Sequence, residues 1–147
     1  MDKKSFLQAG HTPTLLAAFL YFDLAFMVWV LLGPLGISIA KDLGLSHAEK
    51  GMMVATPVLA GALLRIIMGI LVDRLSPKKA AIIGQVVVIA TMLYAWQIGV
   101  HSYGEVLVLG LFLGVAGASF AAALPLASRW YPAEHQGTAM GIAGAGN

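Results

Sequence analysis

The sequence GALLRIIMGILVDR, residues 61–74, places Arg65 in the middle of an apolar run that ends in an Asp-Arg pair. A charged side chain near the centre of a membrane-spanning helix costs at least ~2.5 kcal/mol on insertion scales. Because the rest of this run is apolar enough to lie in lipid, the cost of Arg65 must be offset by a partner or by a function.

The composition of the whole chain is that of a membrane protein. Hydrophobic residues make up 59% of the 147 residues and charged residues only 11%, whereas a soluble domain contains about 25% charged residues. Cysteine is absent, which excludes a disulfide framework and a thiolate metal site. The formal net charge of +2 is too small to indicate nucleic acid as a partner.

Four apolar stretches follow one another along the chain. They cover residues 14–40, 51–72, 80–99 and 106–128, and a fifth occupies residues 137–147. Each of the four is long enough for a helix to cross ~30 Å of hydrocarbon, which takes ~20 residues. Since the connectors are short and polar, we predict an all-α membrane protein in which neighbouring helices run antiparallel.

Basic residues gather on one side of the predicted helices. Lys3 and Lys4 precede the first helix, Arg74, Lys78 and Lys79 follow the second and Arg129 follows the fourth, whereas the other side has Lys41 and Lys50. The positive-inside rule then predicts a cytoplasmic amino terminus in the cell membrane. The first apolar run exceeds the ~7 to 15 residues of a signal-peptide core, so we expect it to be retained.

The residues alone leave three interpretations of Arg65. The side chain could snorkel to the cytoplasmic end of its helix, roughly 10 Å away at ~1.5 Å per residue. It could pair with Asp23, which lies at a similar depth. It could also bind an anion between helices, because a guanidinium presents a planar fork of donors to a flat oxyanion. Gly61 and Gly69, on the same helical face, leave space beside Arg65 and favour the anion site.

Asp23 is the only acidic side chain within the predicted helices. It could relay protons or neutralise a cation. The four histidines lie at helix ends or in connectors, without a cluster of further ligands or carboxylates. We therefore expect neither a metal site nor a hydrolytic triad, and no cofactor or enzymatic activity.

Glycines form two stripes on the predicted helices. Gly137, Gly141, Gly144 and Asn147 share one face of the fifth helix, and Gly110, Gly114 and Gly117 form a similar strip on the fourth. Such faces allow two helices to approach closely. The amide of Asn147, on the same face, needs a hydrogen-bonding partner within the membrane.

The segment GILVDRLSPKK, residues 69–79, resembles the loop between helices two and three of the major facilitator superfamily. In that family this loop acts as a charge-relay latch that governs alternation between inward-open and outward-open states. The resemblance assigns the latch to Gly69, Asp73, Arg74, Lys78 and Lys79. The same residues also form a solvated, positively charged loop.

Three further segments, AMGIAGAGN (139–147), LYFDLAFMVWVLLGPLGISIAKDLGLS (20–46) and LGVAGASFAAALPLASRWYP (113–132), are similar to assimilatory nitrate transporters of the nitrate/nitrite porter family. By position, the resemblance implies that Arg65 grips the substrate and that Phe120 lines the site. It also implies that Gly144, Gly146 and Asn147 belong to the glycine-rich nitrate signature of helix five.

The resemblance implies transport of nitrate, or of nitrite, by alternating access. Uptake of an anion into a negative cell is opposed by ~2.3 kcal/mol per charge per 100 mV, so it needs inward protons or outward nitrite, with Asp23 as the local candidate for proton coupling.

Members of the superfamily have two six-helix halves, so residues 1–147 are expected to be part of the amino-terminal half of a longer transporter that requires its carboxy-terminal half. The alternatives are a carrier of another small anion, or a truncated membrane protein that transports nothing and in which Asp23 and Arg65 pair.

Overall fold

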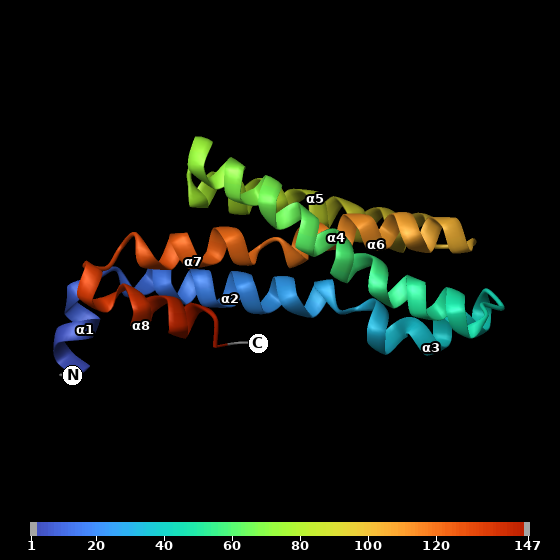
Figure 1. The fold of residues 1–147 in the computed structure, drawn as a ribbon, viewed down its shortest axis with the longest axis horizontal. Coiled ribbons are helices and arrows are strands. Elements are labelled where there is room, and N and C mark those ends of the chain that lie inside the picture. Colours follow the sequence, from blue (N-terminus) through green and yellow to red (C-terminus); the bar gives the residue numbers. More distant parts are fainter. Residues whose placement is uncertain (1–2, 146–147) are drawn as a thin grey trace.

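The computed structural model describes residues 3–145, which form helices joined by short connectors (Figure 1). The helices are α1 (Lys3–Ala9), α2 (Thr12–Trp29), α3 (Leu32–Asp42), α4 (His47–Arg74), α5 (Pro77–Ile98), α6 (Tyr103–Gly117), α7 (Phe120–Ser128) and α8 (Ala133–Ala143). Four helical units are long and apolar enough to cross a membrane: Thr12–Asp42, His47–Arg74, Pro77–Ile98 and Tyr103–Ser128. The prediction of an all-α protein with four spans is confirmed.

The helices begin before the apolar runs do, and at the second, third and fourth spans a serine caps the first turn. The second span begins at His47 rather than at 51, since Ser46 and Glu49 form a capping box. The third begins at Pro77 rather than at 80, and proline is well suited to the first helical position. The fourth span begins at Tyr103 rather than 106, and α8 at Ala133 rather than 137.

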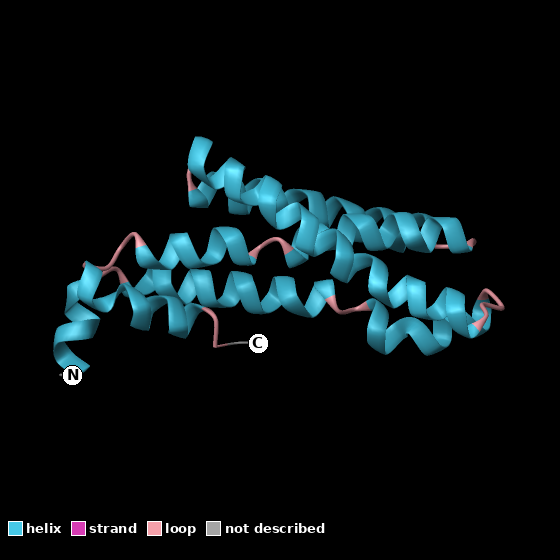
Figure 2. Cartoon of the chain, viewed as in Figure 1, coloured by secondary structure: helices cyan, strands magenta, loops and turns pink. Residues whose placement is uncertain are grey.

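The first predicted span, 14–40, consists of two helices, and the prediction of one continuous helix was wrong. α2 ends at Trp29 and α3 begins at Leu32, with a short loop between them (Figure 2). The cause is Pro34, which has no N–H to donate to the carbonyl of Val30. That carbonyl instead accepts from the Gly33 N–H at 2.9 Å. A short helix, α1, also precedes this span and was not predicted.

The fourth predicted span, 106–128, is also interrupted, between α6 and α7 (Figure 2). In a continuous α-helix the N–H of Ala121 would donate to the carbonyl of Gly117. Here it donates to Ala118 at 3.1 Å instead. The tighter turn leaves the Gly117 carbonyl available to a side chain from another helix.

α4 and α6 make the most extensive helix contact in the described part of the chain. Gly114 is the point of closest approach: a Cβ added there would lie 2.8 Å from the backbone nitrogen of Gly61. One turn earlier, a Cβ at Gly110 would lie 3.2 Å from Pro57. Of the predicted smooth strip on the fourth span, Gly110 and Gly114 therefore pack against α4, whereas Gly117 faces Trp29 of α2. On the other side of the bundle, α2 lies against α7 and α8 (Figure 1).

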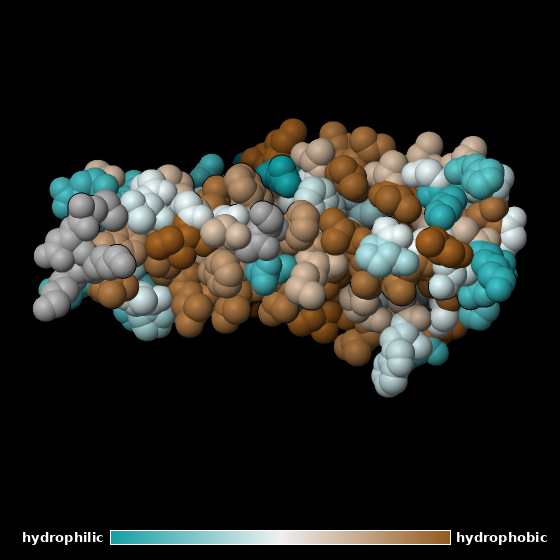
Figure 3. Space-filling model, turned by 90° about the horizontal axis from the view of Figure 1, so that it is seen from below, coloured by the Kyte–Doolittle hydropathy of each residue, from teal (hydrophilic) through white to brown (hydrophobic). Residues whose placement is uncertain are grey.

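The surface agrees with a multi-pass membrane protein. In Figure 3 hydrophobic colours cover most of the middle of the elongated molecule, and hydrophilic colours gather towards its ends. Large apolar side chains are widely exposed, including Leu63 at 69%, Ile66 at 66% and Trp96 at 79%. Such continuous apolar surface is uncommon on soluble monomers and indicates contact with lipid.

Ser76, in the connector between α4 and α5, has a strained backbone. Its φ of 145° and ψ of 157° fall in a region occupied almost only by glycine, at a cost of ~1 to 3 kcal/mol. Ser76→Gly should remove this strain and raise the free energy of unfolding by about 1 kcal/mol, since glycine weakens a helix cap by only a few tenths. Denaturation in detergent micelles, followed by circular dichroism, measures the change.

Ser102 is a matched control, because it caps α6 with an unstrained φ of −141°. Ser102→Gly should lower the free energy of unfolding slightly, because only the cap is weakened. If Ser76→Gly and Ser102→Gly changed the free energy of unfolding equally, Ser76 would not be strained.

Candidate functional site

Arg65 lies in the middle of α4, half-buried, facing the break between α6 and α7. Its Nε donates a hydrogen bond of 3.1 Å to the carbonyl of Gly117. This carbonyl is the one that the break releases from the helix, so the interrupted fourth span holds Arg65 in place. An uncharged carbonyl leaves the positive charge of the guanidinium uncompensated.

The terminal amino groups of Arg65 make no hydrogen bond to any residue that the structure describes. Nor does an ion pair within 4.0 Å link Arg65 to Asp23, although both residues belong to the described part of the chain. The pairing interpretation therefore has no counterpart in this structure. The pinned Nε also distinguishes Arg65 from a side chain that snorkels to the helix end.

Two aromatic rings flank the guanidinium. The Cζ atom of Arg65 lies 5.4 Å from the ring centroid of Trp29 on α2 and 5.2 Å from that of Phe120 on α7. Both distances are within the range of a cation–π interaction. The ring centroid of Phe22 on α2 lies 5.4 Å from that of Phe120, so Phe22 packs against Phe120. The structure thus brings together Arg65 and Phe120, the two residues assigned to the site by resemblance within the four spans.

Trp29 was not predicted as part of the site. Its Nε1 donates a hydrogen bond of 2.7 Å to the carbonyl of Pro57 on α4. Its ring fits over two glycines, since a Cβ added at Gly61 or Gly117 would come within 3.0 Å of it. The signal in the sequence was the spacing of Phe22, Phe26 and Trp29, which places three aromatic rings on one face of α2.

The glycines flanking Arg65 on α4 do not both have the predicted role. The space at Gly61 is occupied by Trp29 rather than left open, because the indole must lie flat to reach the Pro57 carbonyl. A Cβ added at Gly69 would meet nothing within 4 Å, so this side remains open.

Trp29→Phe should lower the free energy of unfolding by about 1 kcal/mol or more, because one part-buried hydrogen bond is lost and the phenyl ring fills less of the space beside Gly61 and Gly117. Trp96→Phe is the control: Trp96 is 79% exposed, and its replacement should change stability by less than ~0.5 kcal/mol. Thermal unfolding in detergent, with circular dichroism as the signal, compares the two. Equal losses would show that the Trp29 bond contributes nothing.

Among the described residues, none of the other predicted substrate and coupling residues forms a hydrogen bond or an ion pair with Arg65. Asp23 is half-buried on α2. A Cβ added at Gly144, the residue after α8, would approach its own helix and Leu124 on α7. Gly146 and Asn147 lie outside the described residues. Likewise, a Cβ at Gly137 or Gly141 would meet nothing within 4 Å, so the predicted close approach is not made there.

The predicted latch residues lie together at one end of the bundle. Asp73 and Arg74 end α4, Lys78 and Lys79 belong to the first turn of α5, and all four are exposed. Within the described residues no ion pair joins them.

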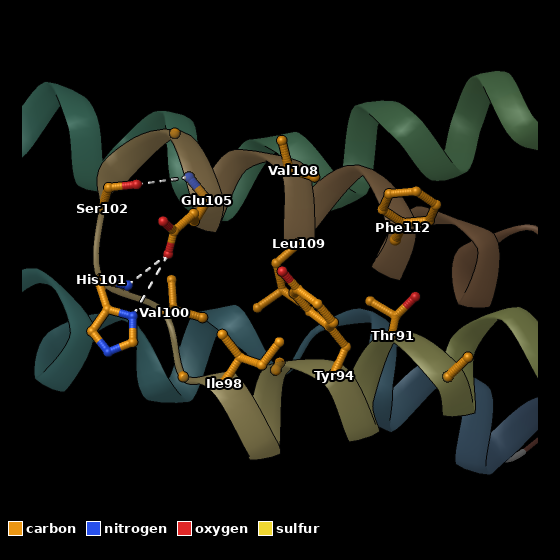
Figure 4. A pocket seen from close by; sticks show the side chains of 14 residues that line it. Thr91, Tyr94, Ile98, Val100, His101, Ser102, Glu105, Val108, Leu109 and Phe112 are labelled. Carbon is orange, nitrogen blue, oxygen red and sulfur yellow. Dashed lines mark hydrogen bonds and ion pairs between the residues drawn. The ribbon is translucent and has the colours of Figure 1, made fainter.

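A cavity of about 820 Å³ lies elsewhere, between the end of α5 and the start of α6 (Figure 4). Its walls are mainly apolar and include Tyr94, Leu109 and Phe112. The polar side chains at its rim form hydrogen bonds with the backbone at the start of α6. The Glu105 carboxylate accepts from the His101 N–H at 2.8 Å. Because these groups are engaged with the backbone, the cavity lacks the free cationic donors of the Arg65 site.

Residues 15–147 match the family model described as Major Facilitator Superfamily. The probable nitrate/nitrite transporter NarK2 of Mycobacterium tuberculosis is 40% identical over 141 residues, which are 93% of this chain and 35% of the relative. The probable nitrate/nitrite antiporter NarK1 of Thermus thermophilus is 35% identical over 87% of this chain and 28% of its own length. The nitrite extrusion protein of Bacillus subtilis is 34% identical over 83% of this chain and 30% of its own length. The chain therefore spans about a third of the length of these curated relatives.

Proposed function

Because the chain belongs to the major facilitator superfamily, we propose that it is the amino-terminal part of a longer secondary transporter that moves nitrate, or nitrite, across the membrane by alternating access. The Arg65 site is the observation that carries this proposal. It presents an arginine in the middle of a span, with Nε on a backbone carbonyl and no ion pair to a described residue.

The geometry of Arg65 suits a small planar anion. Since Nε is engaged by Gly117, the terminal amino groups are the donors available to a ligand. Two parallel N–H groups match two oxygens of nitrate or nitrite, and the positive charge offsets the cost of transferring the anion from water. The flanking rings of Trp29 and Phe120 lie within cation–π distance of the guanidinium and help to hold it in place.

The names of the relatives support this substrate class. They are described as nitrate/nitrite transporters and as a nitrite extrusion protein, and the similarity to each covers more than four fifths of this chain. By the same similarity, Gly144, Gly146 and Asn147 are proposed to complete the site, and Gly69, Asp73, Arg74, Lys78 and Lys79 to act as the conformational latch. We further propose a cytoplasmic amino terminus in the cell membrane, since basic residues gather at that end.

Inward movement of nitrate requires a driving force, because a negative membrane potential opposes it by ~2.3 kcal/mol per charge per 100 mV. Exchange for outgoing nitrite or entry of protons would provide it. Asp23 is the acidic residue within the spans to which proton coupling is assigned.

The test is uptake of labelled nitrate into proteoliposomes that contain the transporter carrying this chain. Unlabelled nitrate and nitrite should each compete, whereas carboxylates that carry a hydrocarbon chain should not, because the chain needs space that the compact nitrogen oxyanions do not occupy. Preloading with nitrite and imposing a pH gradient in separate experiments distinguishes exchange from proton symport. Competition by carboxylates alone would assign the protein to another anion, and no uptake under either gradient would refute transport.

A further inference from the structure

A second groove lies at the end of the bundle where α2 and α5 begin and α7 ends. Its volume is about 630 Å³. It is distinct from the Arg65 site, which lies in the middle of the spans. Its floor is apolar and includes Pro13, Ala17 and Leu126.

The charges around this groove are all of one sign. Lys78 from α5 and Arg129 from the end of α7 line it together with the imidazole of His11 at the start of α2. Both cations are exposed, and no acidic residue belongs to the lining. Among the described residues, neither Lys78 nor Arg129 makes an ion pair. Three elements distant in sequence thus surround an apolar groove with donors suited to an anion.

His11 and Trp130 form a fixed edge of the groove. The ring centroids of the two side chains lie 5.0 Å apart. Nδ1 of His11 lies 2.7 Å from the hydroxyl oxygen of Thr14 and 3.3 Å from its backbone nitrogen, so Thr14 holds the imidazole in place. Trp130 is 54% exposed, as is typical of aromatic residues at the membrane–water interface.

The groove continues into the apolar outer surface of the spans. On α2, the exposed side chain of Leu16 is next to the groove-lining Ala17, and that of Leu20 is exposed one turn nearer the middle of the span. On α5, Ile82 and Ile83 are exposed in the turn after Lys78. A ligand that matches both the basic groove and the adjoining apolar surface needs an anionic headgroup and hydrocarbon tails.

We propose that this groove binds an anionic phospholipid, with the phosphate between Lys78 and Arg129 and the acyl chains along α2 and α5. Basic pockets between helices at the cytoplasmic side of a membrane protein are suited to such headgroups. A zwitterionic phosphatidylcholine would bring its own cation towards the two basic side chains and should bind less well. This proposal does not depend on the transported substrate.

Native mass spectrometry of the purified protein with equimolar phosphatidylglycerol and phosphatidylcholine tests the proposal. Phosphatidylglycerol should be retained about five times more often, because the choline cation of phosphatidylcholine is repelled by Lys78 and Arg129, whereas the uncharged glycerol headgroup is not. Lys78→Gln and Arg129→Gln should each abolish most of this preference. Lys79→Gln is the matched control, since Lys79 is a neighbouring exposed lysine outside the groove lining, and it should leave the preference unchanged. Circular dichroism of each variant checks that the helices are retained.

Three outcomes would overturn the proposal. Equal retention of the two lipids would exclude a charge-selective site. If Lys79→Gln and Lys78→Gln lowered the preference for phosphatidylglycerol equally, the preference would come from the general positive charge at this end of the bundle and not from the groove. Displacement of phosphatidylglycerol by millimolar inorganic phosphate would show a site for a soluble anion rather than for a lipid.

Discussion

Arg65→Lys should lower nitrate uptake by about ten- to a hundredfold in the transporter that carries this chain. A lysine retains the charge but has one ammonium group in place of the planar fork, so it cannot bond to Gly117 and present two parallel donors to the substrate at once. The loss of one or more charge-assisted hydrogen bonds, each of ~1.5 to 3 kcal/mol, corresponds to this range of affinity. Initial rates of labelled-nitrate uptake at low substrate concentration measure it.

The amount of protein in the membrane must be equal for this comparison. Lys41→Arg is a suitable control, because it makes the reverse exchange at an exposed position near the end of α3 and should leave uptake unchanged. Unaltered uptake in Arg65→Lys would refute the assignment of Arg65 as the anion anchor. Loss of the protein from the membrane would instead indicate that the bond to Gly117 is required for folding.

Gly114→Ala should lower the free energy of unfolding by about 1 to 3 kcal/mol, the usual cost of overpacking. The new Cβ would overlap the Cβ of Ala60 and lie 2.8 Å from the backbone nitrogen of Gly61. Backbone atoms of a helix cannot rotate away, so α4 and α6 would have to separate along their most extensive contact. Unfolding in mixed detergent–SDS micelles, followed by circular dichroism, measures the loss.

Gly51→Ala is the matched control within α4. A Cβ at Gly51 meets nothing within 4 Å, so alanine should stabilise the helix by up to ~1 kcal/mol through its higher propensity. Both substitutions replace glycine with alanine, but the changes that they cause in the free energy of unfolding should have opposite signs. A gain in stability for Gly114→Ala would show that the two helices do not approach as closely as the structure indicates.

The apolar runs were sufficient to predict four spans, because lipid requires every spanning segment to satisfy its own backbone hydrogen bonds in a helix. The ends of those helices depended on caps such as Ser46 with Glu49, which lie outside the apolar runs. The interruption near Pro34 was readable in principle, since proline cannot donate to the residue four positions earlier. It was missed because hydropathy remains high across it.

For the site, the sequence identified Arg65 because a charge is costly at that depth, and similarity to a family added Phe120. It did not identify Trp29 or the carbonyl of Gly117. Both are contributed by helices that are distant from α4 in the sequence, and their contact with Arg65 depends on how α2 and the broken α6–α7 unit pack.

Hydropathy and the position of one charge therefore established the fold class and the residue around which the site is built, since both follow from local transfer energies in a membrane. The hydrogen-bonding partner of Arg65, the carbonyl of Gly117, was determined only by the tertiary structure. The break after Gly117 frees a carbonyl, and the small residues at positions 61 and 117 admit the ring of Trp29. Both contacts form only when helices that are distant in the sequence pack together.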